Sequence, residues 1–363
     1  RRDIEEAPGV VIHTIVDDNL RSALEEGVRR MDMPCIAALD PLVSSLQRYL
    51  GASISRKVGV QHALDNDYFN RMDALNYAIV GCGELTTHGN NLGWSDAAMF
   101  NMVKALELTL NNGNCLLTGK RMGLDLGCFS DYSTYEELED AFRRQMDHFI
   151  GRMIAACDGV ARLHAELLPS PFLSAVIDGC ADKARDVTAG GARYTLSGIQ
   201  AIQAANVADS LAVARKCVYE DRSLSAVDLL AALRTNYEGN EALRQRLINK
   251  VPKYGNDVEW VDSIAAKWVD YFAGKLAEYT NARGGIYHAG LYTVSAHVPM
   301  GQNVGASLDG RKAKDPLADG GMSAMYGRDR NGPTALLRSV SRIDAKNGSN
   351  GTLLNLKFLP EFF

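Results

Sequence analysis

A thiol and a carboxyl group lie two residues apart in a glycine-rich turn, at Cys82 and Glu84. Gly81 and Gly83 flank the cysteine, and because glycine tolerates sharp bends the backbone can aim both side chains into one cavity. A thiol that abstracts hydrogen or attacks a substrate, beside a carboxyl group that moves protons, forms a complete catalytic pair. In apolar surroundings the same cysteine would be an inert core residue. The pair therefore predicts a catalytic site in which the sulfur and the carboxyl group share one chamber.

The composition of the 363 residues limits the function classes. Hydrophobic residues make up 46% and charged residues 23%, which is typical of a soluble globular protein. The net charge of −5, without a basic run, argues against a nucleic-acid surface. No apolar run approaches the roughly 18 residues of a membrane helix, and the charged start of the chain is no signal peptide. We expect a cytoplasmic protein with a small-molecule substrate and no nucleic-acid or membrane partner.

Seven cysteines are scattered along the chain without a C-x-x-C motif. This pattern favours free thiols in a reducing compartment over a disulfide framework or a zinc site. The seven histidines show no metal-ligand spacing either. We therefore expect no bound metal.

The first 79 residues predict half of a parallel α/β sheet. Val10–Val16 and Pro34–Leu39 are apolar runs typical of buried strands. Helices are expected over Leu20–Met31 and from Asp40, where an aspartate precedes a proline at the first helical position, to about Leu50. Such a fragment cannot stand alone, because both faces of a parallel sheet need cover.

The larger piece predicts helices joined by short apolar runs. Ser95 or Asp96 would cap a helix from Ala97 to Leu110, and further helices are expected near 206–219, 225–236 and 258–279. Tyr292 and Val294 would lie on one side of a strand spanning Leu291–Val298.

Ser133 and Glu136 form a capping box that predicts the start of a long helix. Apolar residues follow at alternating steps of three and four, which indicates one packing face. These residues are Leu138, Phe142, Met146, Phe149, Met153, Ala156, Val160 and Leu163.

From about residue 80 to residue 358 the chain resembles the glycyl radical enzymes, the pyruvate formate-lyase superfamily. Many collinear segments carry this resemblance. They are YAIVGCGE (77–84), GWSDAAMFN (93–101), ANVADSL (205–211), PKYGND (252–257), GLYTVSAHVP (290–299), VGASLDGRK (304–312), PLADG (316–320), GRDRNGPT (327–334) and SNGTLLN (349–355).

The resemblance implies part of a ten-stranded α/β barrel and assigns roles to single residues. Cys82 would form the thiyl radical, and Glu84 would be the acid/base that deprotonates a substrate hydroxyl. Asp96 would contact substrate hydroxyls or cap a helix. Tyr292 and Val294 would line the pocket wall or belong to the barrel core. The Cys-x-Glu motif is similar to that of the family members that dehydrate hydroxyproline or diols. An aryl-acetate decarboxylase of the same family is the alternative activity.

The resemblance also implies a stored radical on a backbone glycine and a homodimer. An iron–sulfur activating enzyme that uses S-adenosylmethionine would install this radical, so no bound cofactor is expected. The family motif Arg-Val-Ser/Ala-Gly-Tyr/Phe does not occur in the sequence. We therefore expect no turnover from the polypeptide as written. We also expect a partial barrel with two open strand edges, which the N-terminal segment or a partner subunit must cover. A further possibility is that the chain is a scaffold without catalytic activity.

The first 79 residues resemble a different family, the pyruvate, phosphate dikinase regulatory proteins. The segments VIHTIVDDNL (11–20), PCIAALDP (34–41) and QHALDNDYFNRMDALN (61–76) carry this second resemblance. No phosphate-binding loop of the type G-x-x-x-x-G-K-[ST] occurs in the chain. We expect a chimera of two pieces, residues 1–79 and 80–363, in which a regulatory kinase or phosphorylase module is the alternative function.

Overall fold

The computed structural model describes residues 69–75, 77–80 and 84–356. The predicted strands and helices between residues 10 and 50, and Cys82 itself, lie outside these ranges. In chain order the elements are α4 (Arg71–Leu75), β1 (Tyr77–Val80), β2 (Glu84–Thr87), β3 (Trp94–Asn101), α5 (Met102–Leu110), α6 (Tyr135–Leu167), α7 (Pro171–Val176), β4 (Ser197–Ile202), α8 (Ala204–Val213), α9 (Ala226–Arg234), α10 (Glu241–Lys250), α11 (Glu259–Ala277), β5 (Tyr287–Gly290), α12 (His297–Gln302) and α13 (Pro333–Val340).

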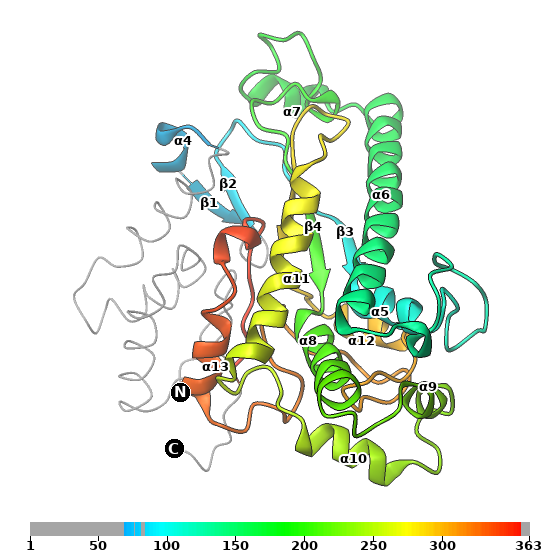
Figure 1. The fold of residues 1–363 in the computed structure, drawn as a ribbon. Helices are drawn as coiled ribbons and strands as arrows, with labels where there is room; N and C mark the ends of the chain where they lie inside the picture. Colours follow the sequence, from blue (N-terminus) through cyan, green and yellow to red (C-terminus); the bar gives the residue numbers. More distant parts are fainter. Residues whose placement is uncertain (1–68, 76, 81–83, 357–363) are drawn as a thin grey trace.

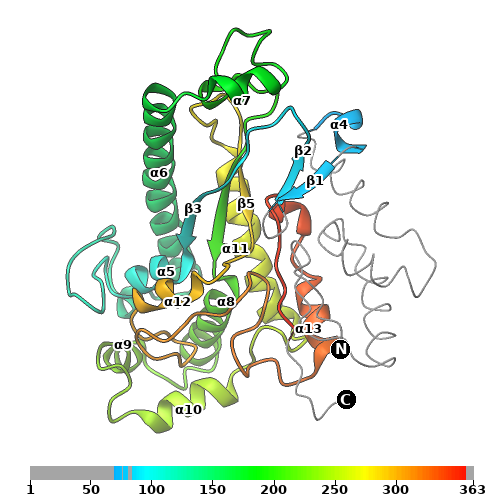
Figure 2. The same cartoon turned by 180° about the vertical axis from the view of Figure 1, so that it is seen from behind.

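The centre of the described fold is a parallel sheet in the order β3-β4-β5. Helices α5, α6 and α7 lie between β3 and β4 in the chain, and α8 to α11 lie between β4 and β5. Every residue of β4 is buried, as expected for a parallel strand covered on both faces. In Figures 1 and 2, α6 runs along one flank of the sheet, and α13 and the antiparallel pair β1–β2 lie on the opposite flank.

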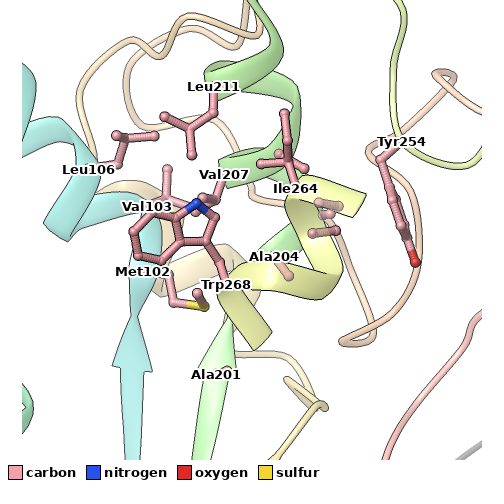
Figure 3. Close-up of a cluster of buried hydrophobic side chains, with 14 of the residues drawn as sticks. Met102, Val103, Leu106, Ala201, Ala204, Val207, Leu211, Tyr254, Ile264 and Trp268 are labelled. Atoms are coloured by element: carbon pink, nitrogen blue, oxygen red, sulfur yellow. The ribbon is translucent and has the colours of Figure 1, made fainter. Parts of the chain in front are cut away.

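Helix α8 is buried on all sides and forms the middle of the core. Figure 3 shows apolar side chains of α5, α8 and α11 meeting around Trp268. Trp268 is 2% exposed, and its ring centroid lies 4.4 Å from that of Phe142 on α6. A helix without a solvated face is mostly apolar, which explains the alanine, valine and leucine residues that make up most of α8.

The polar residues of α8 connect the core to distant loops. Asn206 donates to Asp309 at 2.8 Å and accepts from the backbone N–H of Ala318. Asp209 accepts from the backbone N–H of Tyr254 at 2.7 Å. Four of the family segments therefore meet at this helix, where Asn206 and one oxygen of Asp209 have partners in distant loops. Oδ2 of Asp209 and Oγ of Ser210 have no hydrogen-bond partner among the described residues.

The two flanks of the sheet differ, which corrects the expectation of two open edges. Residues 350–353 run beside β5, where Leu291 donates to the carbonyl of Gly351 and accepts from Leu353, both at 2.8 Å. The outer edge of β3 pairs with no strand in the described part of the chain. The chain itself therefore covers the β5 edge, and the β3 edge is unpaired among the described residues.

Two predicted elements in this piece are wrong. Residues 94–101 form strand β3, and α5 begins only at Met102, where Asn101 caps it by accepting from Lys104. The predicted strand Leu291–Val298 is absent, because β5 ends at Gly290 and a turn leads into α12. Pro299 lies in the first turn of α12, where a proline costs no helical hydrogen bond.

The long helix α6 is confirmed, with two differences in detail. Its cap is Thr134, one residue later than predicted, and Glu137 reciprocates by accepting from the backbone N–H of Ser133 at 2.6 Å. The predicted apolar face is buried up to Met146, but Val160 and Leu163 are 61% and 56% exposed. In that half Ile150, Ile154, Cys157 and Ala161 are buried instead.

Replacing the cap should separate the two candidate capping residues. Thr134→Ala is expected to lower the free energy of unfolding by about 1 kcal/mol, because the N–H of Glu137 loses its acceptor. Ser133→Ala is the matched control, since only its backbone takes part. Urea unfolding of both variants measures the difference, and a larger loss for Ser133→Ala would contradict this cap.

Candidate active site

The carboxyl group of Glu84 is held in a buried position at the start of β2. Val80 at the end of β1 pairs with Glu84, so residues 81–83 join these two strands. Glu84 is only 4% exposed, and the hydroxyl of Tyr292 donates to its Oε1 at 2.8 Å. Two of the predicted site residues are therefore brought together across 208 positions of sequence. Cys82 lies outside the described residues, and its place in the site stays a prediction.

The carbonyl oxygen of Ser95 fixes the direction of the bond between Tyr292 and Glu84. It lies 2.7 Å from Nε2 of Gln200, 2.6 Å from Nδ2 of Asn350 and 2.9 Å from the Tyr292 hydroxyl. A carbonyl oxygen has two lone pairs, which the two amide groups fill. Gln200 also lies 2.6 Å from the tyrosine oxygen as a donor. The tyrosine proton is therefore directed to Glu84.

Two glycines make room for these amide side chains. A Cβ atom on Gly198 would collide with the amide nitrogen of Asn350, and one on Gly290 would collide with Oε1 of Gln200. Gln200 is fully buried, and its Oε1 has no hydrogen-bond partner among the described residues. The glycines of β4 and β5 thus leave space for polar amide groups next to Tyr292. In a purely apolar core these amide groups would lack hydrogen-bond partners.

Asp96 follows Ser95 on β3 and is linked to the same network. Its side chain is exposed, and it lies within strand β3 while Asn101 caps the next helix, so the interpretation of Asp96 as a helix cap is wrong. Partial burial raises the pKa of Asp96, and a hydrogen bond with Gln200 opposes this change. Gln200 therefore lies beside Asp96 as well as beside Tyr292.

Val294 does not lie on a strand with Tyr292. It is 56% exposed in the turn after β5 and has a φ of +50°, whereas Tyr292 is 1% exposed. The alternation assumed from the sequence fails because the strand has already ended. In the described part of the chain Val294 does not share the environment of the buried network.

His288 on β5 is the buried histidine of this region. Its Nδ1 lies 3.2 Å from the hydroxyl of Ser349, next to Asn350. Burial lowers the pKa of His288 to about 3. The imidazole is therefore neutral at physiological pH and acts as a hydrogen-bonding group.

The sequence analysis missed Gln200, Asn350 and His288 as site residues. Asn350 lies within one of the family segments, but a strand-by-strand interpretation gives it no role. Gln200 had one usable signal, since a glutamine inside a continuous apolar strand is a buried polar group that needs partners.

Known proteins provide an independent test of the architecture. Residues 51–301 match the family model for "Pyruvate formate lyase-like", and residues 318–363 match that for "Glycine radical". The chain belongs to the pyruvate formate lyase-like family. Residues 1–81 match the model for "Kinase/pyrophosphorylase". Both resemblances expected from the sequence are confirmed.

Individual relatives agree with these matches. The chain is 35% identical over 295 residues to (2S)-3-sulfopropanediol dehydratase of Klebsiella oxytoca, which covers 80% of this chain and 36% of that protein. It is 34% identical over 281 residues to trans-4-hydroxy-L-proline dehydratase of Clostridioides difficile, covering 77% of this chain and 35% of that one. The chain thus spans about a third of the length of these relatives.

A solved structure confirms the fold. The glycerol-bound B12-independent glycerol dehydratase of Clostridium butyricum superposes with a TM-score of 0.80 at 37% identity, over 84% of this chain and 38% of that chain. The described sheet and its helices are therefore part of a glycyl radical enzyme barrel.

The N-terminal piece has its own relative. It is 68% identical over 77 residues to a putative pyruvate, phosphate dikinase regulatory protein of Caulobacter vibrioides, covering 21% of this chain and 24% of that protein.

Metal and membrane sites were searched across the described ranges. Among residues 69–75, 77–80 and 84–356 no group of histidine, cysteine and carboxylate side chains could hold a metal ion. Within the same ranges no helix is long and apolar enough to cross a bilayer.

The buried histidine predicts a pH dependence of stability. As the pH falls from about 6.5 toward 3, the unfolded chain gains a proton on His288 that the folded chain refuses. Stability should fall on acidification by up to about 1.4 kcal/mol per pH unit from this group. His288→Asn should remove this component, which urea unfolding at several pH values measures.

The control for that experiment is His88→Asn, at an exposed turn position. It removes an imidazole group without touching the buried network. If the free energy of unfolding of His288→Asn changes with pH as steeply as that of the wild type, His288 is not the source of this pH dependence.

Proposed function

We propose that this chain carries the thiyl and acid/base half of a glycyl radical dehydratase that acts on a small polar substrate of the diol or hydroxyproline type. The observation that carries the proposal is the buried carboxyl group of Glu84, which accepts a hydrogen bond from Tyr292. Glu84 follows Cys82 by two residues in the sequence. Relatives named as sulfopropanediol, hydroxyproline and glycerol dehydratases support this class of substrate.

In the proposed reaction the Cys82 sulfur radical takes a hydrogen atom from a carbon that bears a hydroxyl group. A new S–H bond forms, and the unpaired electron moves to that carbon. Glu84 accepts the proton of this hydroxyl group, while the neighbouring substituent leaves with its bonding electrons. The hydrogen atom returns from the Cys82 thiol to the product. Tyr292 holds the carboxyl group in place, and Asp96 binds substrate hydroxyls.

The Cys82 radical that starts this reaction must be generated by a stored glycyl radical. The family motif for the radical glycine does not occur in the sequence. An activating enzyme that uses S-adenosylmethionine is the partner that this chemistry needs. We infer that these 363 residues have no turnover by themselves, and that residues 1–79 and 80–363 are separate units.

Substrate binding tests the site without requiring turnover. Calorimetric titration should detect binding of glycerol or 1,2-propanediol, and Glu84→Gln and Tyr292→Phe should each weaken it about tenfold, through loss of a charged hydrogen bond. Tyr287→Phe is the matched control, because its hydroxyl bonds to Asp158 on α6. Unchanged affinity in both site variants, or preferred binding of an aryl acetate, would contradict a diol site.

Electron paramagnetic resonance tests the supply of the radical. After anaerobic incubation of the full chain with an activating enzyme, S-adenosylmethionine and glycerol, we expect no glycyl doublet and no aldehyde product. A complete glycyl radical dehydratase treated in the same way is the positive control. A glycyl doublet in this chain would overturn the inference that it has no turnover.

The N-terminal piece supports a second candidate function. Its 68% identity to a dikinase regulatory protein favours a phosphotransferase module that acts on a dikinase. Transfer of phosphate to a purified dikinase by the full chain is the assay that distinguishes this activity from the dehydratase.

A further inference from the structure

A buried contact between a lysine and a cysteine joins α5 to the loop that follows it. Nζ of Lys104 lies 3.0 Å from Sγ of Cys115, which is 3% exposed, and the lysine side chain is 14% exposed. Among the five cysteines that the structure describes, Cys115 is the one whose sulfur is hydrogen-bonded to a lysine amine. Two nucleophilic groups are therefore held against each other, away from bulk water.

The surroundings of this contact favour the reactive form of the thiol. Burial raises the pKa of Cys115, but hydrogen bonds from Lys104 and Thr118 lower it by more, so that the pKa lies below that of an ordinary thiol. The thiolate is the form of cysteine that oxidants attack. On the other side of the amine, Oε1 of Glu107 lies 2.6 Å from Nζ of Lys104, where it can accept a proton from the ammonium group.

Glu107 also fixes the cysteine loop relative to the lysine. Its Oε1 accepts from the backbone N–H of Leu116, the neighbour of Cys115, at 2.8 Å, and its Oε2 accepts from the backbone N–H of Gly305 at 2.7 Å. The Glu107 side chain is 2% exposed. Separation of the thiol from the amine would break buried hydrogen bonds to a charged group, which are among the strong ones in proteins.

An apolar hollow of about 310 Å³ gives small molecules a path to this contact. Lys104 belongs to its lining, which otherwise consists mostly of apolar side chains, among them Met99, Phe149 and Met153. Apolar cavities exclude water and accept small apolar molecules. Dioxygen is a molecule of this kind, so it can reach the amine and the thiol although both are shielded from bulk water.

We propose that dioxygen joins Lys104 to Cys115 through a single oxygen atom, in the order N–O–S. The thiolate and the ammonium group each give up two electrons and dioxygen accepts four. S–O and O–N bonds form, two N–H bonds break, and the second oxygen atom leaves as water with these two protons. Glu107 takes one of them from the ammonium group, which frees the nitrogen lone pair, and passes it to the departing oxygen.

The distance between the two atoms favours this bridge over a direct bond. One oxygen atom fits between sulfur and nitrogen at nearly their present separation of 3.0 Å, whereas a direct S–N bond would pull the loop toward α5. The modification site is independent of the proposed dehydratase function, because neither Lys104 nor Cys115 belongs to the network around Glu84.

Mass spectrometry of the full chain tests the proposal. The protein is purified with a reductant under nitrogen, transferred to air-saturated buffer, denatured, alkylated and digested with an endopeptidase that cleaves after glutamate. Cleavage after Glu107 separates Lys104 from Cys115, so only a covalent bridge keeps the two peptides together. We expect a linked pair that is heavier than the two peptides by one oxygen atom less two hydrogen atoms. Dithiothreitol, which supplies the four electrons, should release them.

Three variants complete the experiment, and circular dichroism verifies that each is folded. Lys104→Arg keeps a positive charge beside Glu107, and Cys115→Ser removes the sulfur, so the linked pair should disappear in both. Cys157→Ser is the matched control and should be linked like the wild type, because the buried Cys157 contacts the carbonyl of Ala97 instead of an amine. An unlinked wild-type chain, a linked pair without the added oxygen atom, oxidation of Cys115 to a sulfinic acid alone, or loss of the link in Cys157→Ser would each overturn the proposal.

Discussion

The carbonyl oxygen of Ser95 is the point at which the candidate site is assembled. It accepts from side chains of β4 and of the segment beside β5, and it lies against the tyrosine that follows β5. The three strands must be in register for these donors to converge. Because the two amides fill the carbonyl lone pairs, the tyrosine proton is left for Glu84. The position of this main-chain oxygen thus determines that Tyr292 is the donor and Glu84 the acceptor of their hydrogen bond.

The buried polar network has a cost that the surrounding fold compensates. Gln200, Asn350 and His288 are buried on or beside a sheet that is otherwise apolar. Glycines at 198 and 290 give their side chains the space to reach partners. The fully buried helix α8 and its apolar neighbours supply the stability that such a polar face lacks. A precise site therefore depends on a rigid core behind it.

The two flanks of the sheet show how a partial barrel can remain folded. The chain folds back along β5 and supplies hydrogen bonds at that edge. At β3 no strand within the described residues does this, and an apolar helix face stays exposed beside it. Unpaired strand edges and exposed apolar faces favour pairing with further polypeptide, which is why proteins usually cover them.

The sequence by itself determined the family, named Glu84 and Tyr292 as separate candidate residues and predicted the helices α6, α8, α9 and α11, because motif order and apolar periodicity are local or collinear properties. Only the tertiary structure joined Glu84 to Tyr292. It did not determine where β3 ends, since the apolar run 97–100 suits a helix or a strand equally, and only pairing with β4 decides between them. The exposed half of α6 follows the same rule, because an apolar face becomes core only where another element covers it. The partners of Gln200 lie up to 105 residues away, and only the tertiary structure brings them together.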